Sequence, residues 1–501
     1  MTASAARLLL TIAASVAVAA GLIVGSGDSG KIGMAVALAL AVISGMLWVR
    51  APQRRVLLGL MFLTAPIDVS KAVVPPLDRF YSPGLYVTVS QAVMLVLGLV
   101  WGIERVLVRR ERLPLTSLDV AAFGFLAVVW AGAMHSPAGI LGYASAAAYS
   151  LCVLGFYVVS HTLQTKDDVR LMLKMTIVTF CFEAVYVAAQ MATHSFLTLP
   201  GAKVAPVGTQ GLVYEAEQVS AFRPIGAFDH PNALADYLTL LLPPALALVL
   251  MSRKRLPPDV WRNAVCVGVA AAALLLLTLS RGGWAAGLLG GGVVSVVFLR
   301  KRIIGSGHVL AFAGVVFAGL IAVVAIFPQV VLRLTEPDAR STESRIVLSD
   351  QALTIIKAHP LIGVGYGGYN RAALENTPPS FALISEDYQK QLLKLVVHNH
   401  YLLLASELGL PAMCYWIYLM LRFVRQAWPL SRWQDPGMFA LAVGLAAALV
   451  SQMLYLASDN YYADIRVYLL WLTAGILQAL TLQSPLRPAV TAVQRNEAGR
   501  A

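Results

Sequence analysis

The sequence predicts an all-α polytopic membrane protein with about fourteen transmembrane helices, or about twelve as the alternative count. Of its 501 residues, 58% are hydrophobic and 13% are charged, whereas soluble domains are about a quarter charged. Apolar runs long enough to span a bilayer recur along the chain. Basic residues gather in every second connection between these runs, which is the positive-inside pattern. The net charge of +12 therefore indicates orientation, and no nucleic-acid partner is expected.

Short polar connections and longer outer loops separate the apolar runs. In chain order the runs cover residues 8–24, 32–49, 56–67, 85–103, 118–134, 140–163, 171–191, one that ends near 251, 264–279, 284–299, 309–327, 401–423, 438–457 and 465–480. The first run contains Ala17-Val18-Ala19, which would suit signal-peptide cleavage. We expect the run to be retained, because its removal would leave an odd number of spans. Both termini are then cytoplasmic.

This pattern divides the chain into five segments. They are N-terminal transmembrane helices (1–191), helices that carry two arginine motifs (192–328), a large helical outer loop (329–397), C-terminal transmembrane helices (398–484) and a short cytoplasmic tail (485–501). A long loop with mixed charge between spans is usually functional when it is ordered. The chemistry is therefore expected at residues 330–407.

Two arginines lie at the outer ends of predicted spans. Arg281 directly follows an apolar run in LLLLTLSRGGW, where a guanidinium is costly unless it is paired or faces water. Snorkelling to the outer headgroups is the alternative. Gly282 and Gly283 would let a ligand or another backbone approach closely. Arg223 precedes the eighth span on the same face, and two arginines together suit bidentate binding of a phosphate or diphosphate.

The triplet His230-Pro231-Asn232 follows Arg223 and has two interpretations. Proline at a helix start with asparagine as the cap is ordinary helix chemistry, and it explains both residues without function. The alternative is that His230 and Asn232 contact the substrate.

Arg345 lies in the loop segment ESRIVLSDQALTIIKAHP. Its neighbours Ile346, Leu353 and Ile356 have the spacing of an amphipathic helix that lies on the membrane. Arg345 is then either a substrate-binding residue or a residue of a solvated helix face.

The glycine-rich stretch GVGYGGYN, which contains Gly365 and Tyr366, imitates a phosphate-binding loop. The match is weak, because that motif needs a strand before it and a helix after it. A tight turn that ends a helix at Pro360 is the better explanation, although the turn could still bring backbone amides to a ligand.

Two histidines flank Asn399 in the sequence HNH, where the chain enters the twelfth span. A lone interfacial histidine is usually structural. The pair His398 and His400, facing a loop with arginines, favours a general base. Asp459 and Asp464 near the last outer turn would either orient a sugar or cap spans.

No metal site is predicted. Four cysteines lie inside apolar runs without paired spacing: Cys152, Cys181, Cys266 and Cys414. They are interpreted as small buried hydrophobes rather than zinc ligands or disulfide partners. The outer face contains no DxD motif, no HExxH motif and no acidic cluster, and no cofactor is expected.

Three islands together resemble the superfamily of O-antigen ligases and Wzy-type O-antigen and exopolysaccharide polymerases. They are RPIGAFDHPNALADYL, SRGGW, and HPLIGVGYGGYN with HNHYLLLASELGL, and they cover residues 223–421 in order. The resemblance implies a GT-C-like, metal-independent glycosyltransferase of the bacterial inner membrane with its active site on the periplasmic face. It also implies an undecaprenyl-diphosphate-linked glycan as donor and a glycan or lipid A–core as acceptor.

The resemblance assigns roles to individual residues. Arg223 and Arg281 would hold the diphosphate leaving group, and His398 would be the general base. His400 occupies a more variable position of the motif. Fixed cations stabilise the charge that develops on the leaving diphosphate. In the absence of an evident carboxylate nucleophile, a single inverting displacement is the simpler expectation.

Within this superfamily, polymerases resemble the predicted count of about fourteen spans, whereas ligases tend to have about twelve. The resemblance therefore favours a polysaccharide polymerase over a ligase. A flippase and a chain-length regulator would be its companions, and membrane lipids would contact the loop. A transporter of lipid-linked oligosaccharides is the alternative from another class. It is less favoured, because its charged residues should lie in mid-span rather than at the outer ends.

Overall fold

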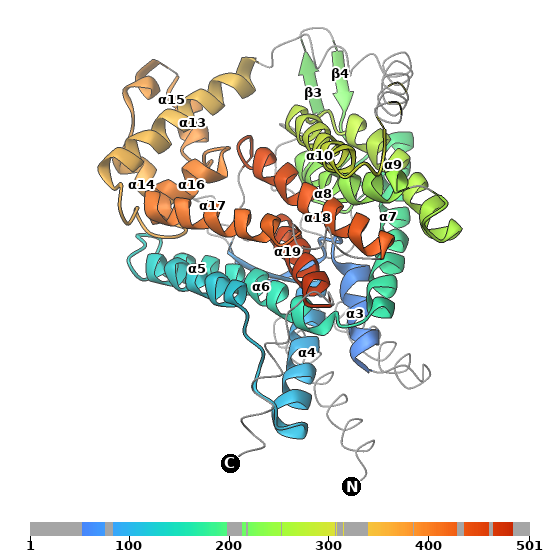
Figure 1. The fold of residues 1–501 in the computed structure, drawn as a ribbon. Coiled ribbons are helices and arrows are strands. Elements are labelled where there is room, and N and C mark those ends of the chain that lie inside the picture. The colour runs from blue at the N-terminus through green and yellow to red at the C-terminus, as the bar shows by residue number, and fades with distance from the viewer. Residues whose placement is uncertain are drawn as a thin grey trace, which may run out of the picture.

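The computed structural model describes residues 53–75, 84–197, 213–216, 219–251, 253–305, 339–383, 385–427, 435–459 and 464–483, with the single residues 307 and 314 (Figure 1). Within these residues, nine helices are long and apolar enough to cross a membrane. They are α4 with the π-helical turn η1 (Val89–Val108), α5 (Ser117–Met134), α6 (Ile140–Thr162), α7 (Lys166–Thr193), α8 (Pro231–Leu250), α9 (Pro258–Leu277), α10 (Arg281–Arg300), α18 (Pro436–Tyr455) and α19 (Ile465–Gln483). The protein is thus a multi-pass helical membrane protein, as predicted.

The remaining helices are shorter or more polar. They are α3 (Gln53–Thr64), α13 (Ala339–Ala358), α14 (Tyr369–Glu375), the 3-10 helix η2 (Pro379–Leu383), α15 (Glu386–Leu392), α16 (His400–Leu408) and α17 (Leu410–Arg425). The predicted spans at 8–24 and 32–49 lie outside the described residues, as does almost all of 309–327. Helix α3 has only twelve residues, which is short for a span.

The prediction of one continuous span over 401–423 is wrong. The chain breaks at Gly409, which has φ of 87° and separates α16 from α17. A side chain at Gly409 would overlap the backbone of Leu361, and the amide of Leu410 donates to the carbonyl of Pro360 at 2.9 Å. The turn after α13 therefore occupies the space that a straight helix would need.

The all-α prediction is confirmed for the bundle, while two outer loops add short antiparallel hairpins that were not predicted from the sequence. The paired strands are β1 (Ser70–Val74) with β2 (Leu85–Thr88), and β3 (Val213–Ala216) with β4 (Val219–Phe222). Their sequences are rich in β-branched and aromatic residues, which favour extended backbone. Strand β2 replaces the start of the predicted fourth span, and α4 begins only after the capping box at Thr88.

Polar contacts sort the helix ends into two layers. In the first layer, Asp168 at the start of α7 accepts hydrogen bonds from Arg54 and Arg55 of α3, both at 2.9 Å. In the second layer, Tyr455 at the end of α18 donates to the carbonyl of Asn232 at the start of α8, also at 2.9 Å. Followed along the chain, the basic connections 104–116, 251–257 and 300–305 all fall in the first layer. We call the second layer the outer end.

The outer loop folds as a small helical domain with its own hydrophobic core. Figure 1 shows α13, α14 and α15 gathered beside α16. Buried side chains from these helices pack together, among them Leu348, Tyr369, Phe381 and Val396. The prediction of a large helical loop is confirmed over its described part.

Candidate active site

Arg223 is buried where β4 leads into α8. Its Nε donates to the carbonyl of Thr278 at 2.8 Å, and its Nη2 donates to Oδ1 of Asn232 at 3.0 Å. Thr278 is the C-cap residue that follows α9, before the turn into α10. The guanidinium therefore ties the start of α8 to the end of α9 at the outer end of the bundle.

His230, rather than Asn232, caps α8, so the capping role expected of Asn232 is wrong. The His230 Nδ1 accepts the amide of Asn232 at 3.0 Å. In the neutral ring the proton is then on Nε2. Desolvation, and after it the charge of Arg223, lowers the pKa of His230 to about 3. The side chain of Asn232 is left to hold Arg223.

The turn that precedes α8 is hydrogen-bonded to side chains of α7. Sequence reasoning did not predict this contact. The side chain of Gln190 on α7 accepts the amides of Ile225 at 3.1 Å and Gly226 at 2.9 Å, and it donates to the carbonyl of Gly226 at 3.0 Å. Glu183 on α7 accepts the amide of Ala227 at 3.0 Å. Both α7 side chains are fully buried. Together they fix the segment that follows Arg223.

His398 lies in the short connection between α15 and α16 and is half-buried. Its Nδ1 has no hydrogen-bond partner in the described part of the chain. Desolvation lowers the pKa of His398; the charge of Asp459 opposes this effect, while Arg345 and Arg466 add to it. The imidazole is therefore neutral near pH 7 and able to accept a proton.

The two residues after His398 fasten the start of α16. The Oδ1 of Asn399 accepts the amides of Tyr401 and Leu402, and its Nδ2 donates to the carbonyl of Ala457 at 3.1 Å. The amide of His400 donates to the carbonyls of Leu456 and Asp459, and its buried ring packs edge-on against Trp416 at 5.1 Å between centroids. These contacts support a structural role for Asn399 and His400, which hold His398 against the turn after α18.

The turn between α18 and α19, together with the start of α19, contributes three charged residues, of which sequence reasoning missed Arg466. Arg466 Nη1 lies 3.3 Å from Asp459 Oδ2, and Arg466 Nη2 lies 2.7 Å from Asp464 Oδ2. Oδ1 of Asp464 accepts the amides of Arg466 and Val467, so the prediction that it caps a span is confirmed. The signal for Arg466 was available, because it is an arginine at the outer end of a span.

Electrostatic coupling shows that these groups form one cluster. The pKa of His230 responds to desolvation first and then to the charges of Arg223, Asp459, Arg466 and His398. We call these five residues the outer-end cluster. It combines two imidazoles, two guanidinium groups and one carboxylate, contributed by three regions that are far apart in the sequence.

Arg281 begins α10 and is exposed at the same end of the bundle. Ser280 caps this helix by accepting the amide of Gly283 at 3.3 Å. A side chain at Gly282 would overlap Ser458, which directly precedes Asp459. The expectation that these glycines allow close approach is confirmed, and the approaching group is the turn after α18.

A family comparison now connects this arrangement to known proteins. Residues 265–417 match the family model Wzy_C, described as O-Antigen ligase. The resemblance found in the sequence is thereby confirmed over this segment. A search of curated proteins finds no match to the chain.

The O-Antigen ligase match contains only part of the candidate site. Arg281, Arg345 and His398 lie within it, whereas Arg223, Asp459 and Arg466 lie outside it. The structure adds the contacts that connect the two sets. Among the described residues, no three His, Cys, Asp or Glu side chains are grouped as metal ligands would be.

Two predicted substrate-binding residues of the matched segment pack inside the protein. The amide of Gly365 donates to the carbonyl of Glu407 at 2.8 Å. Tyr366 is buried and meets Tyr149 of α6 edge-on, with 6.0 Å between ring centroids. The prediction of a tight turn here is confirmed, since Gly363, Gly365 and Gly367 all have positive φ. The turn joins the outer domain to the bundle.

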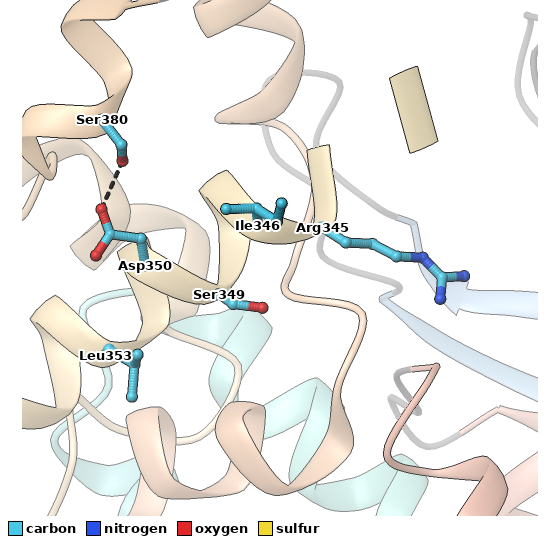
Figure 2. A pocket seen from close by; sticks show the side chains of 6 residues that line it. All are labelled: Arg345, Ile346, Ser349, Asp350, Leu353 and Ser380. Atoms are coloured by element: carbon cyan, nitrogen blue, oxygen red, sulfur yellow. Dashed lines mark hydrogen bonds between the residues drawn. The ribbon is translucent and has the colours of Figure 1, made fainter. Parts of the chain in front are cut away.

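Arg345 lies on the outward face of α13 and lines an open hollow of about 560 Å³. Figure 2 shows its side chain extending away from the other residues that line this hollow. Of the amphipathic set predicted for this helix, Ile346 and Leu353 are exposed, whereas Ile356 is buried in the packed face. Arg345 thus lies at the edge of the outward face of α13, and its charge lowers the pKa of His398.

Proposed function

We propose that this protein is a glycosyltransferase that moves a glycan from undecaprenyl diphosphate to a hydroxyl group of an acceptor. The observation that carries the proposal is the neutral imidazole of His398 in one cluster with the cationic Arg223 and Arg466. Arg281 is exposed at the same end. A base beside fixed cations is what transfer from a diphosphate requires.

In the proposed reaction, the acceptor oxygen attacks the anomeric carbon of the donor sugar. His398 takes the hydroxyl proton on its imidazole ring. The bond between the anomeric carbon and the diphosphate oxygen breaks, and the electron pair leaves with undecaprenyl diphosphate. Arg223 and Arg281 bind the departing diphosphate, and their guanidinium groups supply the positive charge without a metal ion. A single displacement of this kind inverts the anomeric configuration.

The proposed location is the bacterial inner membrane, with the active site on the periplasmic face. Support comes from the separation of the outer-end cluster from the basic connections, which the positive-inside rule assigns to the cytoplasm. Cysteine labelling tests this orientation. In a variant without native cysteines, a membrane-impermeant maleimide should label Lys390→Cys in intact cells. It should label Lys254→Cys only after permeabilisation, and the reverse pattern would overturn the orientation.

The two candidate enzymes of this class, a polymerase and a ligase, differ in the product that they form. We propose that the product is a polymer and that the enzyme is a polymerase, because the predicted count of about fourteen spans is closer to that of the polymerases in this superfamily. Such a polymerase would work with a flippase and a chain-length regulator. Ligation of a glycan to lipid A–core is the second candidate, and the description of the matching family as O-Antigen ligase favours it.

The decisive assay uses purified protein with an undecaprenyl-diphosphate oligosaccharide, followed by a gel of the lipid-linked products. A ladder of lengthening glycans that is absent for His398→Ala and Arg281→Ala would support the polymerase. Transfer that requires added lipid A–core would support the ligase. If neither product forms and the variants behave like the native protein, the proposed chemistry is wrong and lipid flipping should be measured.

A further inference from the structure

The outward face of α13 contains a hollow that the transfer chemistry does not use. It is lined by Arg345, Ile346, Ser349, Asp350, Leu353 and, from η2, Ser380 (Figure 2). The opposite face of α13 is packed into the core of the outer domain through Val347, Leu348 and Ile355. The lining side chains therefore face outward, and the packing of the opposite face holds α13 in this orientation.

The hollow combines hydrogen-bonding groups with aliphatic surface. Ser380 Oγ donates to Asp350 Oδ2 at 2.6 Å, and Oδ1 of Asp350 has no partner among the described residues. Ser349 also lines the hollow, while Ile346 and Leu353 are 64% and 44% exposed. A carboxylate and hydroxyl groups bind sugar hydroxyls, and aliphatic side chains cover the apolar faces of sugar rings.

A membrane-lying helix would require a different face. Leu353 and Ile346 are separated by Ser349 and Asp350, so inserting them into lipid would draw a carboxylate into the same layer. A buried charge without a paired cation is costly. The mixed face is therefore better suited to a hydrated glycan than to acyl chains.

The position of the hollow identifies which substrate would occupy it. Arg345 lies at one edge, and its charge acts on His398. The groups proposed to bind the diphosphate, Arg223 and Arg281, belong instead to the starts of α8 and α10. Val397, which directly precedes the base His398, packs in the same core as Leu348 of α13. The hollow therefore belongs to the domain that carries the base, which must meet the acceptor hydroxyl, rather than to the helix starts that hold the leaving group.

We propose that this hollow is a binding subsite for the acceptor glycan, in which Asp350 and Ser349 bind sugar hydroxyl groups and Leu353 supports a ring face. This assignment rests on the proposed function and extends it to substrate recognition. It makes Asp350 a specificity residue that does not contact the reacting atoms.

The test uses the purified full-length protein and a free oligosaccharide of one repeat unit, cut from the polysaccharide of the host strain. Binding is measured by saturation-transfer NMR for the native protein, Asp350→Ala and Leu353→Trp, which fills the hollow. Asp387→Ala on α15 is the matched control, because its exposed carboxylate lies in the same domain outside the hollow. Transfer by each variant is measured in parallel as KM and kcat.

Both hollow variants should weaken oligosaccharide binding and raise KM about tenfold or more, with kcat and the Asp387→Ala control unchanged. His398→Ala should bind the oligosaccharide like the native protein and lose transfer. If His398→Ala transfers normally, the proposed function fails while the binding result stands on its own. If both hollow variants bind normally, the subsite is overturned. It is also overturned if bromine-labelled acyl chains quench the added tryptophan of Leu353→Trp, because the face would then lie in lipid.

Discussion

The Oδ1 atom of Asn232 accepts a hydrogen bond from Nη2 of Arg223 at 3.0 Å, nine residues earlier in the chain. The carbonyl of the same asparagine accepts the hydroxyl of Tyr455 at 2.9 Å. Asn232 thus connects a proposed diphosphate-binding arginine to the end of α18. The side chain of Arg223 is therefore held by the first turn of α8 and by the carbonyl of Thr278 at the end of α9.

Asn232→Ala should lower the transfer rate about tenfold or more, because a hydrogen bond to a charged group is lost and the guanidinium is less well oriented. Initial rates with the lipid-linked donor measure this effect. Asn376→Ala in the outer domain is the control, since, among the described residues, that side chain bonds only the carbonyl of Ala372, one turn earlier in the chain. Equal rates for the two variants would contradict an orienting role for Asn232.

The pH dependence of transfer should move in opposite directions in two variants. Transfer requires neutral His398, so the rate falls as the pH drops through its pKa. The carboxylate of Asp459 favours the imidazolium and Arg345 disfavours it. Asp459→Asn should therefore lower the pKa of His398 and shift the acidic limb to lower pH, whereas Arg345→Ala should raise the pKa and shift it to higher pH.

Profiles of kcat/KM against pH measure both shifts. A limb that moves the same way in the two variants would show that the titrating group is not His398. His398→Ala supplies the baseline, since its residual activity should lack this limb.

Gln190→Ala should destabilise the outer end of the bundle by about 2 kcal/mol or more, because buried amides of the segment after Arg223 lose their acceptor. Thermal unfolding in detergent and donor binding should both be affected. Gln426→Ala is the control, because in the part of the chain that the structure describes its side chain bonds only the carbonyl of Phe423. Unchanged donor binding in a destabilised Gln190→Ala protein would separate folding from the orientation of Arg223.

Two glycines with similar backbone angles should respond differently to alanine. Gly139 has φ of 58° with open space around it, whereas Gly363 has φ of 63° and a side chain there would overlap the backbone of Glu407. Gly139→Ala should cost about 1–3 kcal/mol for its conformation alone. Gly363→Ala should cost more and displace the junction of α16 and α17. The free energy of unfolding distinguishes the two effects, and equal losses would mean that the close contact is unimportant.

Local patterns predicted most of the spans that the structure describes, the helical outer loop and the glycine turn, and the role of His398 stays a prediction. They could not predict Asn232 as the partner of Arg223, because His230 competes for the capping position and only the three-dimensional path decides between them. Asp459 and Arg466 join the cluster through the turn after α18, more than two hundred residues from Arg223. The break at Gly409 was hidden because the residues on both sides are apolar, and its cause is the distant backbone of Leu361.

The separate core of the outer domain has an evolutionary consequence. Its packed residues and its outward residues occupy opposite faces of α13, so outward positions can change while the fold that holds His398 is preserved. Under the proposed function, acceptor recognition would then vary independently of leaving-group binding, because substitutions on one exposed helix face leave the contacts of Arg223 and His398 unchanged.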